Sequence, residues 1–248
     1  MALRTGVIVA PKYKLACVLV PKCATTTLID LFARIHERPM KGKDRHDLHF
    51  VPYQPPVRAE EPVVIRLDNS DLPRLREELN DYLWFTVVRD PHERIVSNYA
   101  DKLNRFCRRF RRPIYVRAKL VQFVRGPKAW KDSNSVDDFY QSHVAFSEFL
   151  ESLMKHGIDW DPHYRLQISF VQQGKVQYDA VLRLENLRDS LVDFLETRGM
   201  PQQVVDCART MRKLNSGRRS GPDVYSLTER PKVAQLYRPD FEALGYPP

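Results

Sequence analysis

Apolar residues occur along this chain in two patterns, as short continuous runs and as longer segments with apolar positions three or four residues apart. The continuous runs predict buried strands at residues 15–20, 62–67, 83–88 and 179–184, and at most a short strand within 48–51. The spaced pattern predicts helices at residues 25–36, 72–82, 137–155, 186–198 and 201–214, with a further helix beginning at 90–93. Apolar strands that alternate with helices indicate an α/β fold, in which helices flank a central parallel sheet.

Composition places the chain among ordinary globular proteins. It has 248 residues, of which 43% are hydrophobic, enough for a well-buried core. We therefore predict a single domain over residues 1–248. The longest apolar run, residues 15–20, is far shorter than the roughly 20 residues of a membrane-spanning helix.

Positive charge is concentrated in one segment. The chain carries a net charge of +9, yet residues 102–131 alone hold eleven Lys or Arg and no Asp or Glu, which leaves −2 for all other residues. Aromatic residues are interleaved with these cations. Such an insert suits an anionic acceptor or an anionic membrane surface. A pair of amphipathic helices with aromatic residues packed inward is an equal alternative, and nucleic acid is less favoured.

The first candidate for chemistry is the loop "VPKCATTTL", residues 20–28. It connects a predicted strand to a predicted helix, where unpaired N–H groups and the helix dipole favour anions. Lys22 adds a cation, and Thr25, Thr26 and Thr27 add hydroxyl groups. A simple strand–loop–helix junction capped by threonine is the alternative interpretation.

The second candidate is "VVRDPHERIVSNY", residues 87–99. Arg89 ends the strongest predicted strand, and Ser97 lies two turns into the following helix. Arginine can bind a phosphate through two parallel N–H groups, and a serine can add a third donor. An ion pair of Arg89 with Asp90 or Glu93 is the alternative.

Two better-known phosphate loops are excluded. A nucleotide-hydrolysing P-loop requires two glycines before its lysine, and this chain has no glycine between Gly6 and Gly42. A cysteine phosphatase loop centred on Cys23 would require an arginine where Ile29 stands.

Taken in order, the two motifs resemble those of sulfotransferases that use 3′-phosphoadenosine 5′-phosphosulfate (PAPS). The likeness is greatest to the carbohydrate sulfotransferases of chondroitin and related glycans. The segments "FSEFLESL", "DWDPHYRL", "YDAVLRLENL" and "LYRPDFEALGY" follow in the order of that family. The resemblance implies that the 5′-phosphosulfate is held by Lys22, Cys23, Ala24, Thr25, Thr26 and Thr27. It also implies that Arg89 and Ser97 bind the 3′-phosphate.

The resemblance further implies a base for the acceptor hydroxyl. Among the seven histidines, His49 and then His46 match the position after the first crossover helix, and His163 is a third candidate. A solvated loop histidine is the alternative for each. His92 lies within the second motif, where we expect it to serve the start of the helix. Arg218, in "LNSGRRSGP", could close over the nucleotide or belong to a solvated turn.

These observations predict an O-sulfotransferase that moves a sulfuryl group from PAPS to a carbohydrate or glycolipid, without a metal. The alternative from another class is a non-catalytic basic protein that binds nucleotide or nucleic acid; a nucleotide kinase is disfavoured by the missing glycines. No cleavage signal follows Met1, and the four cysteines form no C-x-x-C pair. We therefore expect a bacterial cytoplasmic enzyme, with peripheral contact at the inner membrane as a further expectation.

Overall fold

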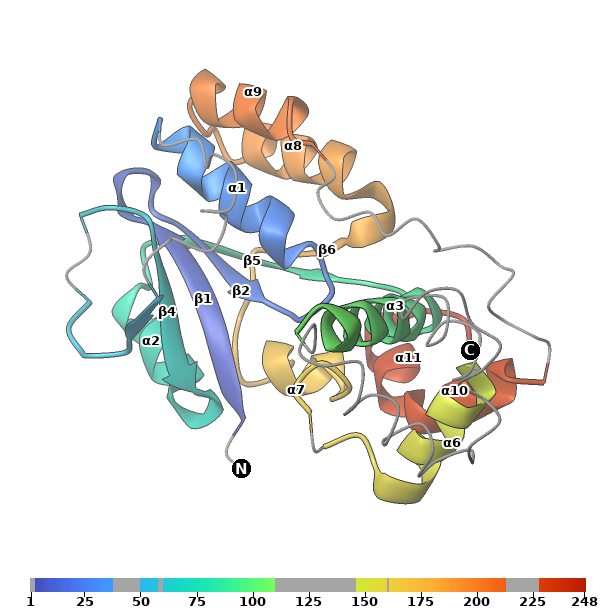
Figure 1. The fold of residues 1–248 in the computed structure, drawn as a ribbon. Helices are drawn as coiled ribbons and strands as arrows, with labels where there is room; N and C mark the ends of the chain where they lie inside the picture. The colour runs from blue at the N-terminus through green and yellow to red at the C-terminus, as the bar shows by residue number, and fades with distance from the viewer. Residues whose placement is uncertain (1–2, 38–49, 58–59, 110–145, 160, 213–227) are drawn as a thin grey trace. The chain divides into compact units, whose positions relative to one another are not determined.

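The computed structural model describes residues 3–37, 50–57, 60–109, 146–159, 161–212 and 228–248 (Figure 1). The chain divides into two compact units. The larger comprises Met1–Pro91, Asp159–Ser216 and Pro239–Pro247, and the smaller comprises His92–Ile158 and Gly217–Arg238 together with Pro248. The sheet and the loops that follow residues 20 and 88 lie in the larger unit. That all 248 residues form one domain stays a prediction.

A six-stranded sheet, in the order β3-β4-β1-β2-β5-β6, forms the centre of the larger unit. Its strands are β1 (Arg4–Ala10), β2 (Leu15–Leu19), β3 (Phe50–Pro52), β4 (Val63–Asp68), β5 (Leu83–Val88) and β6 (Ala180–Arg183). The pairs β3–β4, β2–β5 and β5–β6 are parallel, whereas β1 runs antiparallel to both of its neighbours, β2 and β4. The α/β class is thus confirmed, with five strands running in one direction.

The expectation of a fully parallel sheet is wrong at β1. Only a short 3₁₀ turn, Pro11–Tyr13, and Lys14 in the left-handed conformation (φ 47°) separate β1 from β2. A parallel pair needs a crossover of a dozen or more residues, so this connection permits only a hairpin. Residues 4–10 were not among the predicted strands.

Three helices cover one face of the sheet: α1 (Thr25–Ile35), α8 (Leu187–Thr197) and α9 (Gln202–Arg209) (Figure 1). Aromatic side chains join α1 and α8 to β5. The ring of Phe85 on β5 lies 6.3 Å from that of Phe32 and 5.9 Å from that of Phe194. All three side chains are buried, which fixes α1 and α8 against β5.

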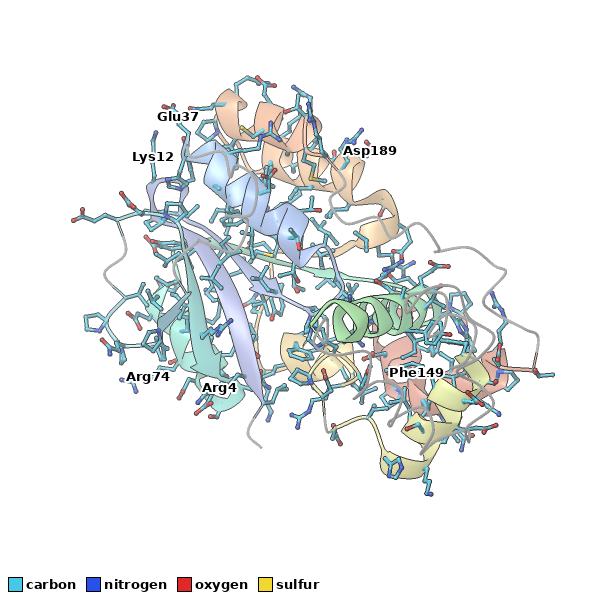
Figure 2. The ribbon with its side chains drawn as sticks, in the orientation of Figure 1. Arg4, Lys12, Glu37, Arg74, Phe149 and Asp189 are labelled. Carbon is cyan, nitrogen blue, oxygen red and sulfur yellow. The ribbon has the colours of Figure 1, made fainter. Side chains whose placement is uncertain are left out.

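The other face carries α2 (Leu72–Glu78). Its Leu72 and Leu75 pack into a cluster with Val7, Val18 and Trp84 from three strands. Charged side chains such as Arg74 on α2 and Asp189 on α8 project outward from these elements (Figure 2).

Several helices differ in length from the prediction or were not predicted. Helix α2 ends at Glu78 because the Leu79 carbonyl accepts the indole N–H of Trp84 (3.0 Å) and the Tyr82 amide (3.2 Å) in place of a further helical bond. The short helices α7 (Gln167–Val171) and α11 (Arg238–Leu244) were missed, as was α10 (Arg230–Leu236).

The smaller unit is helical in its described part, with α3 (Pro91–Arg109), α6 (Phe146–His156) and α10. Tyr99 of α3 packs edge-on against Phe146 (5.3 Å between ring centres) and at a tilt against Phe149 (5.5 Å). Lys232 of α10 pairs with Glu151 of α6 at 3.3 Å. None of the described helices is long and apolar enough to span a membrane.

Candidate functional site: two loops at one edge of the sheet

The two candidate loops begin at the carboxyl ends of neighbouring parallel strands. Strand β2 pairs with β5 from Leu15 opposite Leu83 to Val18 opposite Thr86. Paired strands lie about 4.8 Å apart, so the loop after β2 and the turn after β5 leave the sheet side by side. The Thr86 hydroxyl donates to the Val18 carbonyl (3.0 Å), which strengthens this pairing near the loops. Open α/β sheets bind their ligands at this edge.

The loop after β2 turns sharply without glycine. Lys22 (φ 70°) and Ala24 (φ 61°) both adopt the left-handed conformation. Each such residue costs on the order of 1–3 kcal/mol and persists where its surroundings enforce it, commonly at ligand sites. Here the Cys23 amide and the Thr25 hydroxyl both donate to the Val20 carbonyl, each at 3.1 Å.

Helix α1 begins directly after this loop. Ala24 is its N-cap residue, and Thr25, Thr26 and Thr27 form its first turn. Lys22, Thr25 and Thr26 are partly exposed, whereas Thr27 is buried. The Thr25 hydroxyl donates to the Val20 carbonyl, so this residue serves the strand–loop–helix junction. The start of the helix can still face an anion.

The turn after β5 is fixed through its backbone. The Arg89 amide donates to Gln167 Oε1 (2.9 Å), and Gln167 Nε2 donates to the Arg89 carbonyl (2.8 Å). The Asp90 amide donates to Glu185 Oε1 (2.8 Å). With three successive backbone groups held by two side chains, the guanidinium of Arg89 extends from a defined point.

Gln167 also reaches the first loop. Its Oε1 accepts the thiol of Cys23 at 3.2 Å, and its side chain is fully buried. The Gln167 amide donates to Asp240 Oδ2 (2.9 Å) and the Ile168 amide to Asp240 Oδ1 (3.0 Å), so a buried carboxylate of α11 caps α7. Residues of α7 and α11 therefore support both loops.

A second support comes from the end of the chain. The Tyr246 hydroxyl donates to Glu185 Oε2 at 3.0 Å. Burial, and secondarily the Glu185 carboxylate, raises the pKa of Tyr246 well above its ordinary value, so the phenol remains a donor throughout the physiological range. Arg183 stacks on the Tyr246 ring (4.4 Å to its centre) and donates to the carbonyls of Leu244 (3.1 Å) and Gly245 (2.9 Å).

Gln167, Glu185 and Asp240 were missed by sequence reasoning. They lie in or next to segments on which the family resemblance rests, but no local spacing links them to the loops. Gln167 is 144 residues from Cys23 and 78 from Arg89. Only the tertiary structure shows this connection.

The other predicted residues fall into two groups. His46, His49, Arg218 and most of the basic insert lie outside the described residues, so their roles stay predictions. Ser97 is partly exposed on α3, in the smaller unit, and its contribution to the 3′-phosphate site also stays a prediction.

Two of the histidines singled out from the sequence, His92 and His163, lie within the described residues. The Nδ1 atom of His163 lies 2.8 Å from Asp161 Oδ1, a contact that fixes the orientation of the ring. His92 is the second residue of α3 and is buried; its role at the start of the helix stays a prediction.

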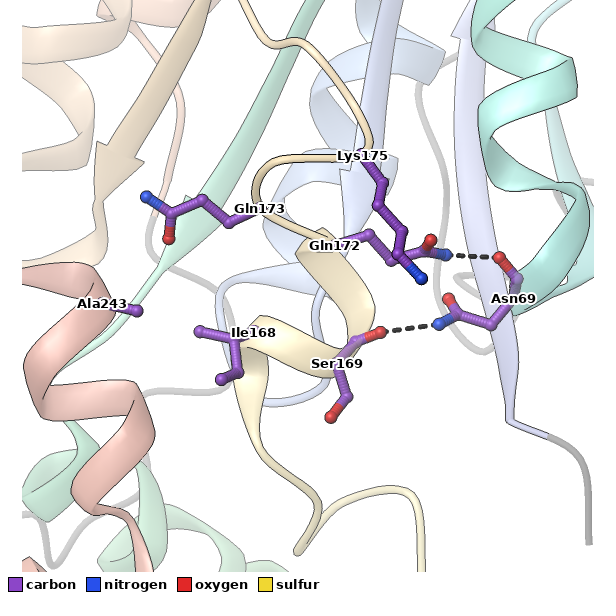
Figure 3. A pocket seen from close by; sticks show the side chains of 7 residues that line it. All are labelled: Asn69, Ile168, Ser169, Gln172, Gln173, Lys175 and Ala243. Carbon is purple, nitrogen blue, oxygen red and sulfur yellow. Dashed lines mark hydrogen bonds between the residues drawn. The ribbon is translucent and has the colours of Figure 1, made fainter.

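A cavity of about 550 Å³ opens at the same edge of the sheet, beyond the end of β4 (Figure 3). Asn69, Ser169, Gln172 and Lys175 give it a polar lining. Asn69 Nδ2 donates to the Ser169 carbonyl (2.7 Å), and the Gln172 amide group donates to the Asn69 carbonyl. None of the predicted donor-binding residues that the structure describes lines this cavity. Within the described residues, no group of three His, Cys, Asp or Glu is arranged to hold a metal ion.

Comparison with known proteins identifies the family. Residues 5–247 match the model of the sulfotransferase family. Over 141 residues the chain is 27% identical to human carbohydrate sulfotransferase 9, a stretch that spans 56% of this chain and 30% of the human protein. No solved structure matches the chain. The family match covers nearly the whole chain, including both loops, and confirms the resemblance; the chain belongs to the sulfotransferase family.

Proposed function

We propose that this protein transfers a sulfuryl group from PAPS to a hydroxyl group of a carbohydrate or glycolipid. The observation that carries the proposal is the pair of loops, which start from adjacent parallel strands and are both bonded to Gln167. One loop brings Lys22 to the start of α1, and the other brings Arg89. Two cationic points at one sheet edge suit a ligand with two separate phosphate groups.

In the proposed reaction the acceptor oxygen forms a bond to sulfur as the bond from sulfur to the 5′-phosphate oxygen breaks. Adenosine 3′,5′-bisphosphate is the leaving product, and the acceptor proton passes to a base, for which His49 is the first candidate. The Lys22 ammonium is suited to stabilise charge on the leaving oxygen, and the start of α1 adds its dipole. Arg89 anchors the nucleotide through the 3′-phosphate. These steps need alignment and charge stabilisation more than covalent chemistry from the protein.

The carbohydrate acceptor is inferred from the human relative, which is named a carbohydrate sulfotransferase. The basic segment 102–131 would favour an acidic acceptor or a glycolipid at an anionic surface.

The donor is tested by thermal unfolding with adenosine 3′,5′-bisphosphate. At a ligand concentration of about 100 Kd, binding stabilises the folded state by about 2.7 kcal/mol. For a chain of this size that raises Tm by about 5–10 °C. Adenosine 5′-phosphate, which lacks the 3′-phosphate, is the matched control and should give a much smaller shift. A large shift with ATP and none with the bisphosphate would exclude PAPS as the donor.

Arg89→Ala tests the assignment of the 3′-phosphate. Loss of charge-assisted hydrogen bonds is expected to weaken bisphosphate binding by about tenfold to a hundredfold. Binding of adenosine 5′-phosphate should change little, and calorimetry with both ligands measures the difference. The matched control is Arg74→Ala, because Arg74 is an exposed arginine on α2. An equal loss of affinity for both nucleotides would show that Arg89 does not contact the 3′-phosphate.

A further inference from the structure

Gln167 is a buried amide whose polar atoms connect three segments of the larger unit. Its Oε1 accepts hydrogen bonds from the Arg89 amide (2.9 Å) and the Cys23 thiol (3.2 Å), and its Nε2 donates to the Arg89 carbonyl (2.8 Å). Its backbone amide is held by Asp240 (2.9 Å). A fully buried side chain with its acceptor and its donor both engaged has little freedom to move.

We propose that Gln167 is a positioning residue that sets the spacing between the 5′-phosphosulfate loop and the 3′-phosphate turn. The inference rests on the proposed function, because it assigns to these loops the two ends of one donor nucleotide. Gln167 acts through the backbone of Arg89 and through Cys23, between the two left-handed residues Lys22 and Ala24.

An amide suits this task better than other side chains. The Arg89 backbone offers one N–H and one C=O, which require an acceptor and a donor from the same partner. A carboxylate supplies only acceptors, and a hydroxyl group is too short to serve both from α7. Because a bisphosphate must contact both loops at once, a change in their spacing weakens its binding even where each loop keeps its own shape.

The experiment compares Gln167→Met with Gln172→Met. Both replace a glutamine of the same segment by a side chain of similar size without hydrogen bonds. Gln172 donates instead to the carbonyl of Asn69, which follows β4 and belongs to neither donor loop. Q167M is expected to weaken binding of adenosine 3′,5′-bisphosphate about tenfold or more, while binding of inorganic phosphate, which needs only one loop, changes little. Q172M loses a single hydrogen bond of a partly exposed side chain and should keep the wild-type affinity for the bisphosphate.

Gln167→Glu supplies a readout that a merely structural role would not move, and it keeps the test open if Q167M does not fold. When ionised, the carboxylate cannot donate to the Arg89 carbonyl; when protonated, its O–H can. Burial raises the pKa of such a carboxyl group, so the protonated form returns as pH falls towards 5. The affinity of Q167E relative to wild type should therefore recover at low pH. The titratable residues bonded to residue 167, which are Cys23, Arg89 and Asp240, are the same in both proteins. The comparison with wild type therefore reports the new carboxyl group.

Each outcome decides one point. Weak bisphosphate binding by Q167M, with recovery of Q167E at low pH, supports the positioning role. Wild-type affinity in Q167M, or a Q167E-to-wild-type ratio that does not change with pH, overturns it and leaves the proposed donor intact. If the wild-type protein itself does not bind the bisphosphate, the proposed donor is wrong and the inference falls with it.

Discussion

Replacing Lys22 by methionine is expected to lower kcat for sulfuryl transfer by about 10²–10³-fold, the loss typical of removing one group that stabilises charge in a transition state. Methionine keeps most of the length of the lysine stem but has no charge. Both residues pay a comparable cost for the left-handed conformation at this position (φ 70°), so the loop should keep its shape. The measurement is turnover with labelled PAPS and an acceptor found by screening neutral and acidic oligosaccharides.

The matched control for this variant is Lys12→Met. Lys12 is an exposed lysine in the turn that precedes β2, at the edge of the sheet opposite the Lys22 loop (Figure 2). It lies over the ring of Tyr13 (5.2 Å) and has no part in the proposed reaction. K12M should turn over at the wild-type rate. If K22M retained more than about a tenth of wild-type kcat, the role assigned to Lys22 would be wrong.

Trp84→Ala is expected to lower the free energy of unfolding by about 3–5 kcal/mol. Trp84 is completely buried on β5 among the side chains of α2, and its indole N–H donates to the Leu79 carbonyl (3.0 Å). The alanine variant loses this packing and leaves a cavity between α2 and the sheet. Urea unfolding followed by far-UV circular dichroism, which does not depend on tryptophan fluorescence, measures the change.

Val181→Ala is the control for the effect of truncating a strand residue. Val181 lies on the edge strand β6 and is 47% exposed, so its truncation should cost less than about 1 kcal/mol. Both variants are expected to unfold in one transition with an unchanged m value. Equal unfolding midpoints for the two variants would show that the cluster around Trp84 contributes little to stability.

The parts of the fold that sequence predicts well are those with a local cause. Strands β2 and β5 are apolar on both faces, and α1 has apolar residues at helical spacing, so each element and each loop between them follows from its own residues. Because parallel strands end at one edge, the two loops could also be expected to meet there. The structure places them on paired strands.

The parts that the sequence did not predict depend on very short turns and helices or on contacts between residues far apart in the chain. The direction of β1 is decided by a turn of a few residues, and α7 has only five residues, too few for a periodic pattern. Gln167 looks like an ordinary polar residue until its partners 78 and 144 positions away are known. Its long-range bonds leave no mark in the local sequence.

The support of the loops by Asp240 also affects when the two loops can reach their final structure during synthesis. The loop around Lys22 leaves the ribosome before its supports, since Gln167 follows Cys23 by 144 residues and Asp240 follows Gln167 by a further 73. Until the segment with Asp240 has emerged, α7 lacks its cap and the two loops lack their common support. During synthesis the nascent chain therefore carries the Lys22 loop in an unfinished form until the segment with Asp240 has been added.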